Sequence, residues 1–173
     1  MENNKMNLFE KIKGNRELNL SLMRECDILF YEKIKEVAFQ GHGEIYSIPC
    51  KAFAQDGSGG EFVFLNDGSI ALIGSEGEVG RISESLEELL TFLIHAGSVF
   101  DFNCKQIYQN QNSLKEYCSK YISKIREDYH AENKDWDKLR SGIAKDLSLS
   151  FNPDKLAEFA MNFYKAAIRE PIF

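Results

Sequence analysis

The stretch from 52 to 94 alternates short apolar runs with glycine-containing turns, and this alternation constrains the fold more than any other feature. The apolar runs at 62–65, 70–73 and 79–82 are rich in Phe, Val and Ile, which favour strands. Only four or five residues separate one run from the next. Because parallel strands need much longer crossovers, such connections require antiparallel pairing. The sequence therefore predicts a three-stranded antiparallel meander, to which a strand candidate at 44–48 would add a fourth.

Five glycines are expected to shape the turns of this meander: Gly57, Gly59, Gly60, Gly68 and Gly77. The Asp67-Gly68 pair can adopt the positive φ values that a tight hairpin loop needs. The cluster at 57–60 suggests a phosphate-binding loop, but it lacks the trailing Lys-Ser/Thr, and a strand follows it instead of a helix. We therefore interpret it as a turn or bulge whose backbone needs positive φ.

Helical patterns flank the meander on both sides. Ser85 and Glu88 form a capping box ahead of an apolar stripe at 86–94, which predicts a helix packed on the sheet. On the N-terminal side, apolar residues recur at steps of three and four from 22 to 38, which predicts a second helix. The polar segment at 1–15 contains one apolar cluster and predicts a short helical lead-in.

The last third of the chain predicts three more helices. The first begins with the capping-box residues Ser113 and Glu116, the second covers 136–147, and the third is capped by Asn152. The polar run at 128–135 is expected to be a loop between the first two. This order of elements indicates an α+β fold: an antiparallel β-meander sheet with helices packed on one face, and a helical C-terminal third.

The length of the chain limits the number of domains, and its net charge limits the kinds of partner that it can bind. At 173 residues, the range 1–173 is expected to form a single domain, with its core at 20–100 and its C-terminal helices at 105–170. There are 27 acidic and 21 basic residues, which gives a net charge of −6. Direct nucleic-acid binding needs clustered cations and is not expected. A protein partner with a basic surface suits this charge better.

The remaining composition excludes several kinds of site. No apolar run approaches the ~20 residues of a membrane helix, and 1–15 lacks the apolar region of a secretory signal, so a cytoplasmic location is expected. The four cysteines, at 26, 50, 104 and 118, form no CxxC pair and are expected to be reduced and mostly buried.

His95 lies at the end of a predicted helix, where a cation suits the helix dipole. Neither a metal nor a cofactor is expected.

Acidic residues gather in the turns: Asp56, Glu61, Asp67, Glu76 and Glu78. If two of them share one end of the sheet, they could act as the paired carboxylates of a hydrolase. In a binding protein, we expect Asp56, Glu76 and Glu78 to be exposed and to face cationic residues of the partner. Trp136 follows a charged loop and is either a core anchor or a surface hot spot for the partner.

The turn and strand motifs together resemble the SUKH superfamily. They are DGSGG at 56–60, EFVF at 61–64, the Asp67-Gly68 pair, an Ile-bounded strand at 70–73, and SEG at 75–77 with a helix after it. The superfamily includes the yeast cell-wall-synthesis regulator and many bacterial proteins, and the resemblance covers residues 20–100. It implies an α+β fold with a central antiparallel sheet and packed helices. It also implies a role as an immunity protein, since bacterial members chiefly neutralise the toxin domains, often nucleases, of polymorphic or contact-dependent toxins.

Three functions remain open at this point. The first is a non-enzymatic immunity protein that occludes the active site of a toxin. The second is an intracellular regulator or scaffold that binds another protein. The third is a hydrolase that uses the turn carboxylates.

Overall fold

The computed structural model describes residues 2–38 and 49–169. Two helices come first, α1 (Glu2–Lys13) and α2 (Arg16–Cys26). The strands are β1 (Leu29–Lys35), β2 (Cys50–Gln55), β3 (Glu61–Leu65), β4 (Ile70–Ile73) and β5 (Val79–Ser83). The helices that follow are α3 (Leu86–Ala96), α4 (Gln111–Ala131), α5 (Trp136–Asp146) and α6 (Leu156–Ile168), with short 3-10 turns η2 (Phe100–Phe102), η3 (Lys105–Tyr108) and η4 (Pro153–Lys155).

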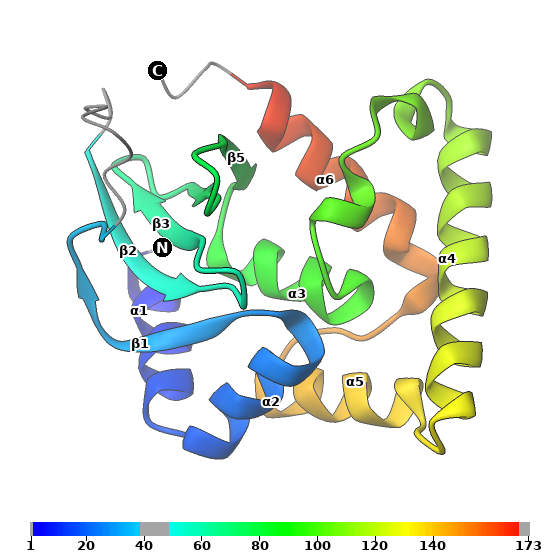
Figure 1. The fold of residues 1–173 in the computed structure, drawn as a ribbon, viewed down its shortest axis with the longest axis horizontal. Helices are drawn as coiled ribbons and strands as arrows, with labels where there is room; N and C mark the ends of the chain where they lie inside the picture. Colours follow the sequence, from blue (N-terminus) through cyan, green and yellow to red (C-terminus); the bar gives the residue numbers. More distant parts are fainter. Residues whose placement is uncertain (1, 39–48, 170–173) are drawn as a thin grey trace.

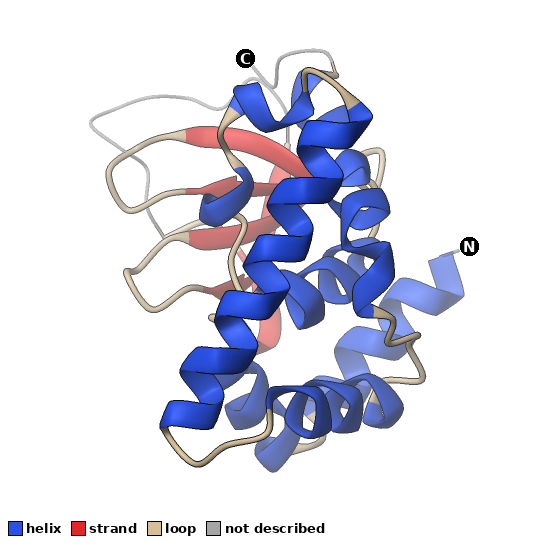
Figure 2. Ribbon diagram, turned by 90° about the vertical axis from the view of Figure 1, so that its right-hand side faces the viewer, coloured by secondary structure: helices blue, strands red, loops and turns tan. Residues whose placement is uncertain are grey.

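The strands form one antiparallel sheet in the order β1-β2-β3-β4-β5 (Figure 1). Figure 2 shows the helices gathered on one side of this sheet. Side chains of alternate strand residues, such as Phe62 and Leu72, join α3 and α6 in one large apolar core. A smaller buried cluster that includes Val63 and Ala71 lies on the opposite face. The predicted α+β class, with a meander sheet and C-terminal helices, is confirmed.

The three hairpins from β2 to β5 share one loop geometry. In the hairpin between β3 and β4, the Leu65 N–H donates to the Ser69 carbonyl at 2.9 Å, and the Gly68 N–H donates to the Leu65 carbonyl at 2.9 Å. The same pair of bonds closes the turns at 56–60 and 74–78. The fourth residue of each turn has positive φ: Gly59 (+96°), Gly68 (+86°) and Gly77 (+93°). Any other residue would strain the backbone there.

Gly57 and Gly60 serve the first of these turns in a different way, because neither has positive φ. A Cβ on Gly57 would lie 2.9 Å from the Asp27 Oδ1 atom, and a Cβ on Gly60 would lie 2.6 Å from the Asp56 Oδ2 atom. Both distances are shorter than real Cβ contacts. The predicted need for positive φ is therefore wrong for these two residues, where a larger side chain would displace a neighbouring carboxylate.

The helix expected at 22–38 is only partly present. Helix α2 ends at Cys26, where Asp27 adopts a left-handed conformation (φ 52°), and β1 follows. Its pairing with β2 shifts register between Phe30 and Lys35, which disturbs the alternation that would have indicated a strand. The Asn19 side chain stabilises the change of direction, because its amide bonds the N–H and the carbonyl of Phe30 at 2.8 and 2.9 Å.

Strand β2 was not predicted at all. Its central residues include two alanines, which have little intrinsic preference for strands, so its conformation depends on pairing with β1 and β3 on either side. The strand candidate at 44–48 lies outside the described residues.

The C-terminal helices follow the predicted order with shifted boundaries. Helix α4 begins at Gln111 and is capped by Asn110, so Ser113 lies inside it and is not its cap. The helix continues into the polar run at 128–135 and ends at Ala131. Helix α5 begins after Asp135, whose side chain accepts the Lys138 N–H. Asn152 caps η4, which leads directly into α6.

A buried polar cluster, here the Arg140 cluster, connects four helices. It consists of Arg140 on α5, Glu25 on α2, Tyr129 on α4 and the last-turn carbonyls of α3. The guanidinium donates to the Leu93 and Ile94 carbonyls at 3.1 and 2.8 Å, to Glu25 at 3.2 Å and to the Tyr129 hydroxyl at 3.1 Å. Arg140 is only 2% exposed. Because C-terminal helix carbonyls attract cations, Arg140 both caps α3 and holds α2 and α4 against it.

Candidate functional site: a groove between α3 and α6

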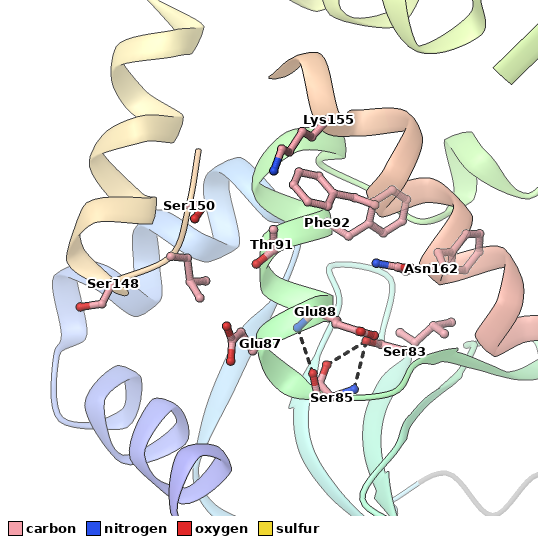
Figure 3. Close-up of a pocket in the computed structure, with 14 residues that line it drawn as sticks. Ser83, Ser85, Glu87, Glu88, Thr91, Phe92, Ser148, Ser150, Lys155 and Asn162 are labelled. Carbon is pink, nitrogen blue, oxygen red and sulfur yellow. Dashed lines mark hydrogen bonds between the residues drawn. The ribbon is translucent and has the colours of Figure 1, made fainter. Parts of the chain in front are cut away.

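A groove of about 460 Å³ lies between α3, α6 and the segment that joins α5 to η4 (Figure 3). We call it the α3–α6 groove. Its lining residues come from five segments of the chain: Ile82, Ser83, Ser85, Glu87, Glu88, Thr91, Phe92, Ser148, Leu149, Ser150, Lys155, Phe159, Asn162 and Phe163. The lining thus combines apolar, hydroxyl and charged side chains.

The apolar part of the groove belongs to the main core. The rings of Phe92 on α3 and Phe163 on α6 are stacked with their centroids 5.3 Å apart. Both are almost fully buried, so they fix the spacing of the two helices. Phe159, one turn earlier on α6, is partly exposed and offers apolar surface to a ligand.

The third wall is the segment 148–152, which runs without regular secondary structure from α5 to η4. Ser148 has a left-handed backbone (φ 57°), and the Leu149 N–H returns to the Ala144 carbonyl at 2.8 Å. This is the arrangement of a helix C-cap. At its other end, the Asn152 N–H donates to the Nε2 atom of His95 at 2.9 Å. The wall is therefore fastened to α5 and to α3.

His95 has no exposed surface and sits behind this wall. Its Nε2 atom accepts the bond from Asn152, so the ring proton is on Nδ1, which lies 2.7 Å from the Thr91 carbonyl. Burial and the nearby Arg140 charge lower the pKa of His95, although its bond to Thr91 opposes this change. His95 therefore has a structural role, but as a buried neutral ring that links two segments and not as a cation at the helix end.

Charge is distributed unevenly along the groove. Glu87 and Glu88 lie in the first turn of α3, and Lys155 lies at the opposite end of the groove in Figure 3. In the described part of the chain, none of these three side chains forms an ion pair. Carboxylates suit a helix N-terminus, yet they remain able to receive a cation from a partner. The groove thus has an acidic end, an apolar middle and a basic end.

The hydroxyl groups of the groove have structural roles. The Ser85 Oγ atom accepts the Glu88 N–H at 3.1 Å, which confirms the predicted cap of α3. The Ser83 hydroxyl donates to the Ser85 carbonyl at 2.8 Å. Among the described residues, neither a histidine nor a carboxylate hydrogen-bonds to a serine of this groove, so no hydroxyl there is activated as a nucleophile.

The cysteines, possible metal ligands and helix lengths of the described residues complete the description. Burial raises the pKa of the Cys26 and Cys118 thiols to about 11, which keeps them protonated and unreactive. Within residues 2–38 and 49–169, no group of His, Cys, Asp and Glu side chains is arranged to hold a metal ion. The same residues include no helix that is long and apolar enough to cross a bilayer.

The acids expected at the partner surface divide into two groups. Glu76 and Glu78 are exposed in the turn at 74–78, at one end of the sheet. Asp56 lies at the same end but is only 4% exposed, because its Oδ1 atom accepts bonds from Ser58 and Gly60 that close its own turn. The expected exposure of Asp56 is therefore wrong.

Asp67 lies at the opposite end of the sheet from the other turn acids, since β3 and β4 carry the chain away and back. It forms the centre of a second polar group, here the Asp67 cluster, with Ser69, Arg81, Arg169 and Glu84. Its carboxylate accepts bonds from Ser69 and Arg169, each at 2.5 Å. Burial alone would raise the pKa of Asp67, but these bonds outweigh it and hold the pKa well below its ordinary value.

Trp136 is a core residue. It is 1% exposed and its ring lies 5.6 Å from that of Phe151, beneath the wall of the α3–α6 groove. A side chain with so little surface does not reach a partner, so the structure favours the core anchor over the surface hot spot.

The α3–α6 groove was not predicted, because its residues already form local patterns that account for them. Ser85 and Glu88 fit a capping box, and Phe159 and Phe163 fit the apolar stripe of a helix. Phe159 likewise belongs to the apolar stripe of α6, and only the structure shows that its ring is partly exposed in the groove.

No family model, no curated protein and no solved structure matches this chain. The resemblance to the SUKH superfamily therefore stays a prediction from the turn and strand motifs.

Proposed function

We propose that this protein is a non-enzymatic binding protein whose α3–α6 groove receives a segment of another protein. The observation that carries this proposal is the groove itself, with its apolar middle beside two carboxylates that have no partner among the described residues. The segment that fits is apolar and carries a Lys or Arg, which would lie against Glu87 and Glu88.

Strand addition, the other common way to bind a peptide, is disfavoured at the β1 edge. The Asn19 amide already occupies the N–H and the carbonyl of Phe30. Glu32, Lys33 and Lys35 are exposed along the rest of the strand, and charged edges discourage pairing. Strand addition at the β1 edge is therefore a less suitable mode than binding in the α3–α6 groove.

The more specific proposal is toxin immunity of the SUKH type. It is supported by the motifs at 56–77 and by the net charge of −6, because an acidic inhibitor is attracted to a basic nuclease domain. Glu76 and Glu78 would contribute to this attraction over a longer range. A regulator or scaffold would use the same groove, so the identity of the partner separates these two functions.

A capture experiment with matched charge variants tests the groove. The test variant is Glu87→Lys/Glu88→Lys. The control is Glu17→Lys/Glu127→Lys, which changes the net charge equally and also places a lysine at an exposed position in the first turn of a helix. Proteins captured from lysate by the immobilised wild type and both variants are identified by mass spectrometry, and the purified partner is then titrated by calorimetry.

We expect a partner that the wild type and the control retain and the groove variant loses, with affinity reduced at least about tenfold by two reversed charge contacts. Equal binding by all three proteins would exclude the groove. Co-expression then separates the functions. A partner whose toxicity the wild type suppresses supports immunity, and a harmless partner supports the regulator.

The hydrolase alternative stays a separate prediction with its own test. A substrate screen at mildly acidic pH, with Glu76→Gln/Glu78→Gln as the comparison, would detect it. Loss of a hydrolytic activity in that variant would overturn the proposal of a non-enzymatic protein.

A further inference from the structure

Gly142 lies in the interior of α5, where the chain itself gives no reason for glycine. Its φ is not positive, and a Cβ built on it touches nothing within 4 Å. Apart from proline, glycine is the least favourable residue in a helix interior. Gly142 therefore destabilises α5, and no neighbouring atom of the described chain requires a glycine there. A glycine at this position would allow the backbone of another molecule to approach closely.

Gly142 lines a second groove, of about 640 Å³, between α2 and α5. On the same face of α5 lie Lys138, Leu139 and Asp146. Leu139 is 39% exposed, one of the few large apolar side chains to be so in the described chain. None of these residues lines the α3–α6 groove.

Lys138 and Asp146 lie at positions where their charges interact unfavourably with the dipole of α5. Lys138 lies in the first turn and Asp146 at the last residue, whereas the helix dipole prefers an acid at the start and a base at the end. In the part of the chain that the structure describes, neither side chain has an ion pair or a hydrogen bond. Neither charge therefore has a stabilising partner among the described residues of this chain.

The spacing of Lys138 and Asp146 suggests a role for their charges if a second α5 crosses the first in the antiparallel direction at Gly142. Residues equally far before and after the crossing point then face each other. Lys138 and Asp146 each stand four residues from Gly142, about 6 Å along the axis, so Lys138 of one copy would lie opposite Asp146 of the other, and the reverse.

We propose that two copies of this chain form a symmetric dimer about a twofold axis at Gly142. Helix α5 of each copy lies in the α2–α5 groove of the other, with Leu139 covered and two Lys138–Asp146 pairs across the axis. A twofold interface must be self-complementary, and the charges of Lys138 and Asp146 make this face so. The dimer does not depend on the function proposed for the α3–α6 groove.

Sedimentation velocity at increasing protein concentration tests the dimer. Four proteins are compared: the wild type, Lys138→Asp, Asp146→Lys and the double variant with both changes. Both substitutions improve the charge balance of α5 as an isolated helix, so thermal unfolding should show that every variant folds. Gly142→Leu is added as a steric variant, since its side chain would fill the space at the crossing point.

The wild type should approach twice its 19.8 kDa mass as concentration rises. Each single reversal should weaken dimerisation about tenfold, because two attractive pairs become repulsive, and the double variant should recover most of the affinity. Gly142→Leu should remain monomeric. A wild type that is monomeric throughout, a dimer indifferent to these changes, or a double variant as weak as the single ones would each overturn the proposal.

Discussion

Two polar clusters join distant parts of this chain, and they differ chiefly in burial. The Arg140 cluster lies among four helices, with Arg140 at 2% and the Glu25 side chain at 14% exposure. The Asp67 cluster lies at the rim of the sheet, where the Asp67 and Arg169 side chains are 47% and 42% exposed. Their hydrogen bonds are comparable in number and length. Burial therefore decides which of them is essential to the fold.

The physical reason is the fate of the partner that remains when one residue is removed. At the exposed Arg169–Asp67 pair of the Asp67 cluster, water replaces the lost group, so the net contribution is small. At the Arg140 cluster, water has little access, so Glu25 is left with the Tyr129 hydroxyl alone and the Ile94 carbonyl loses the Arg140 donor without replacement. The following predictions would sharpen or break this contrast.

Arg140→Met should have the largest effect. It removes the charge that faces the mostly buried Glu25 carboxylate and the donor to the Ile94 carbonyl, which should lower the free energy of unfolding by about 3–5 kcal/mol. Urea denaturation followed by circular dichroism measures this. A loss below about 1 kcal/mol would show that the buried cluster behaves like a surface one.

Glu25→Gln should have a smaller effect, about 1.5–3 kcal/mol, because a charged hydrogen bond is weakened while the α3 carbonyls still hold Arg140. The same denaturation experiment measures it. Combining Glu25→Gln with Arg140→Met gives a double-mutant cycle. Additive losses would mean that the two residues do not act as one unit.

His95 should make stability depend on pH. Its folded pKa lies below the ordinary value of 6.5, so the unfolded chain binds more protons in acid. The stability it contributes is complete above pH 6.5 and falls as the pH drops toward the folded pKa, by at most about 1.4 kcal/mol per pH unit. Urea midpoints from pH 5 to 7.5 should show this slope in the wild type, and His95→Gln should reduce it.

Arg169→Ala should have the smallest effect, below about 1 kcal/mol, because its ion pairs with Asp67 and Glu84 are half exposed. Added salt should shrink the difference from the wild type further. A loss as large as that of Arg140→Met, measured in the same buffer, would remove the contrast between the two clusters.

The sequence reveals features whose causes lie within a few residues of one another. The positive φ of Gly59, Gly68 and Gly77 follows from hairpins closed within five residues. The caps supplied by Ser85 and Asn152 likewise depend on N–H groups two or three residues away. Such local signals predict the meander and most of the helices without any tertiary contact.

Tertiary structure decided what depends on distant partners. Strand β2 exists because β1 and β3 pair with it, and Asp56 and Trp136 are buried although each lies beside an exposed residue in the sequence. The neutral state of His95 requires the N–H of Asn152, far along the chain. The α3–α6 groove likewise needs segments that meet only after folding. Burial and hydrogen bonding between remote segments leave no periodic pattern in the sequence, so only the folded chain reveals them.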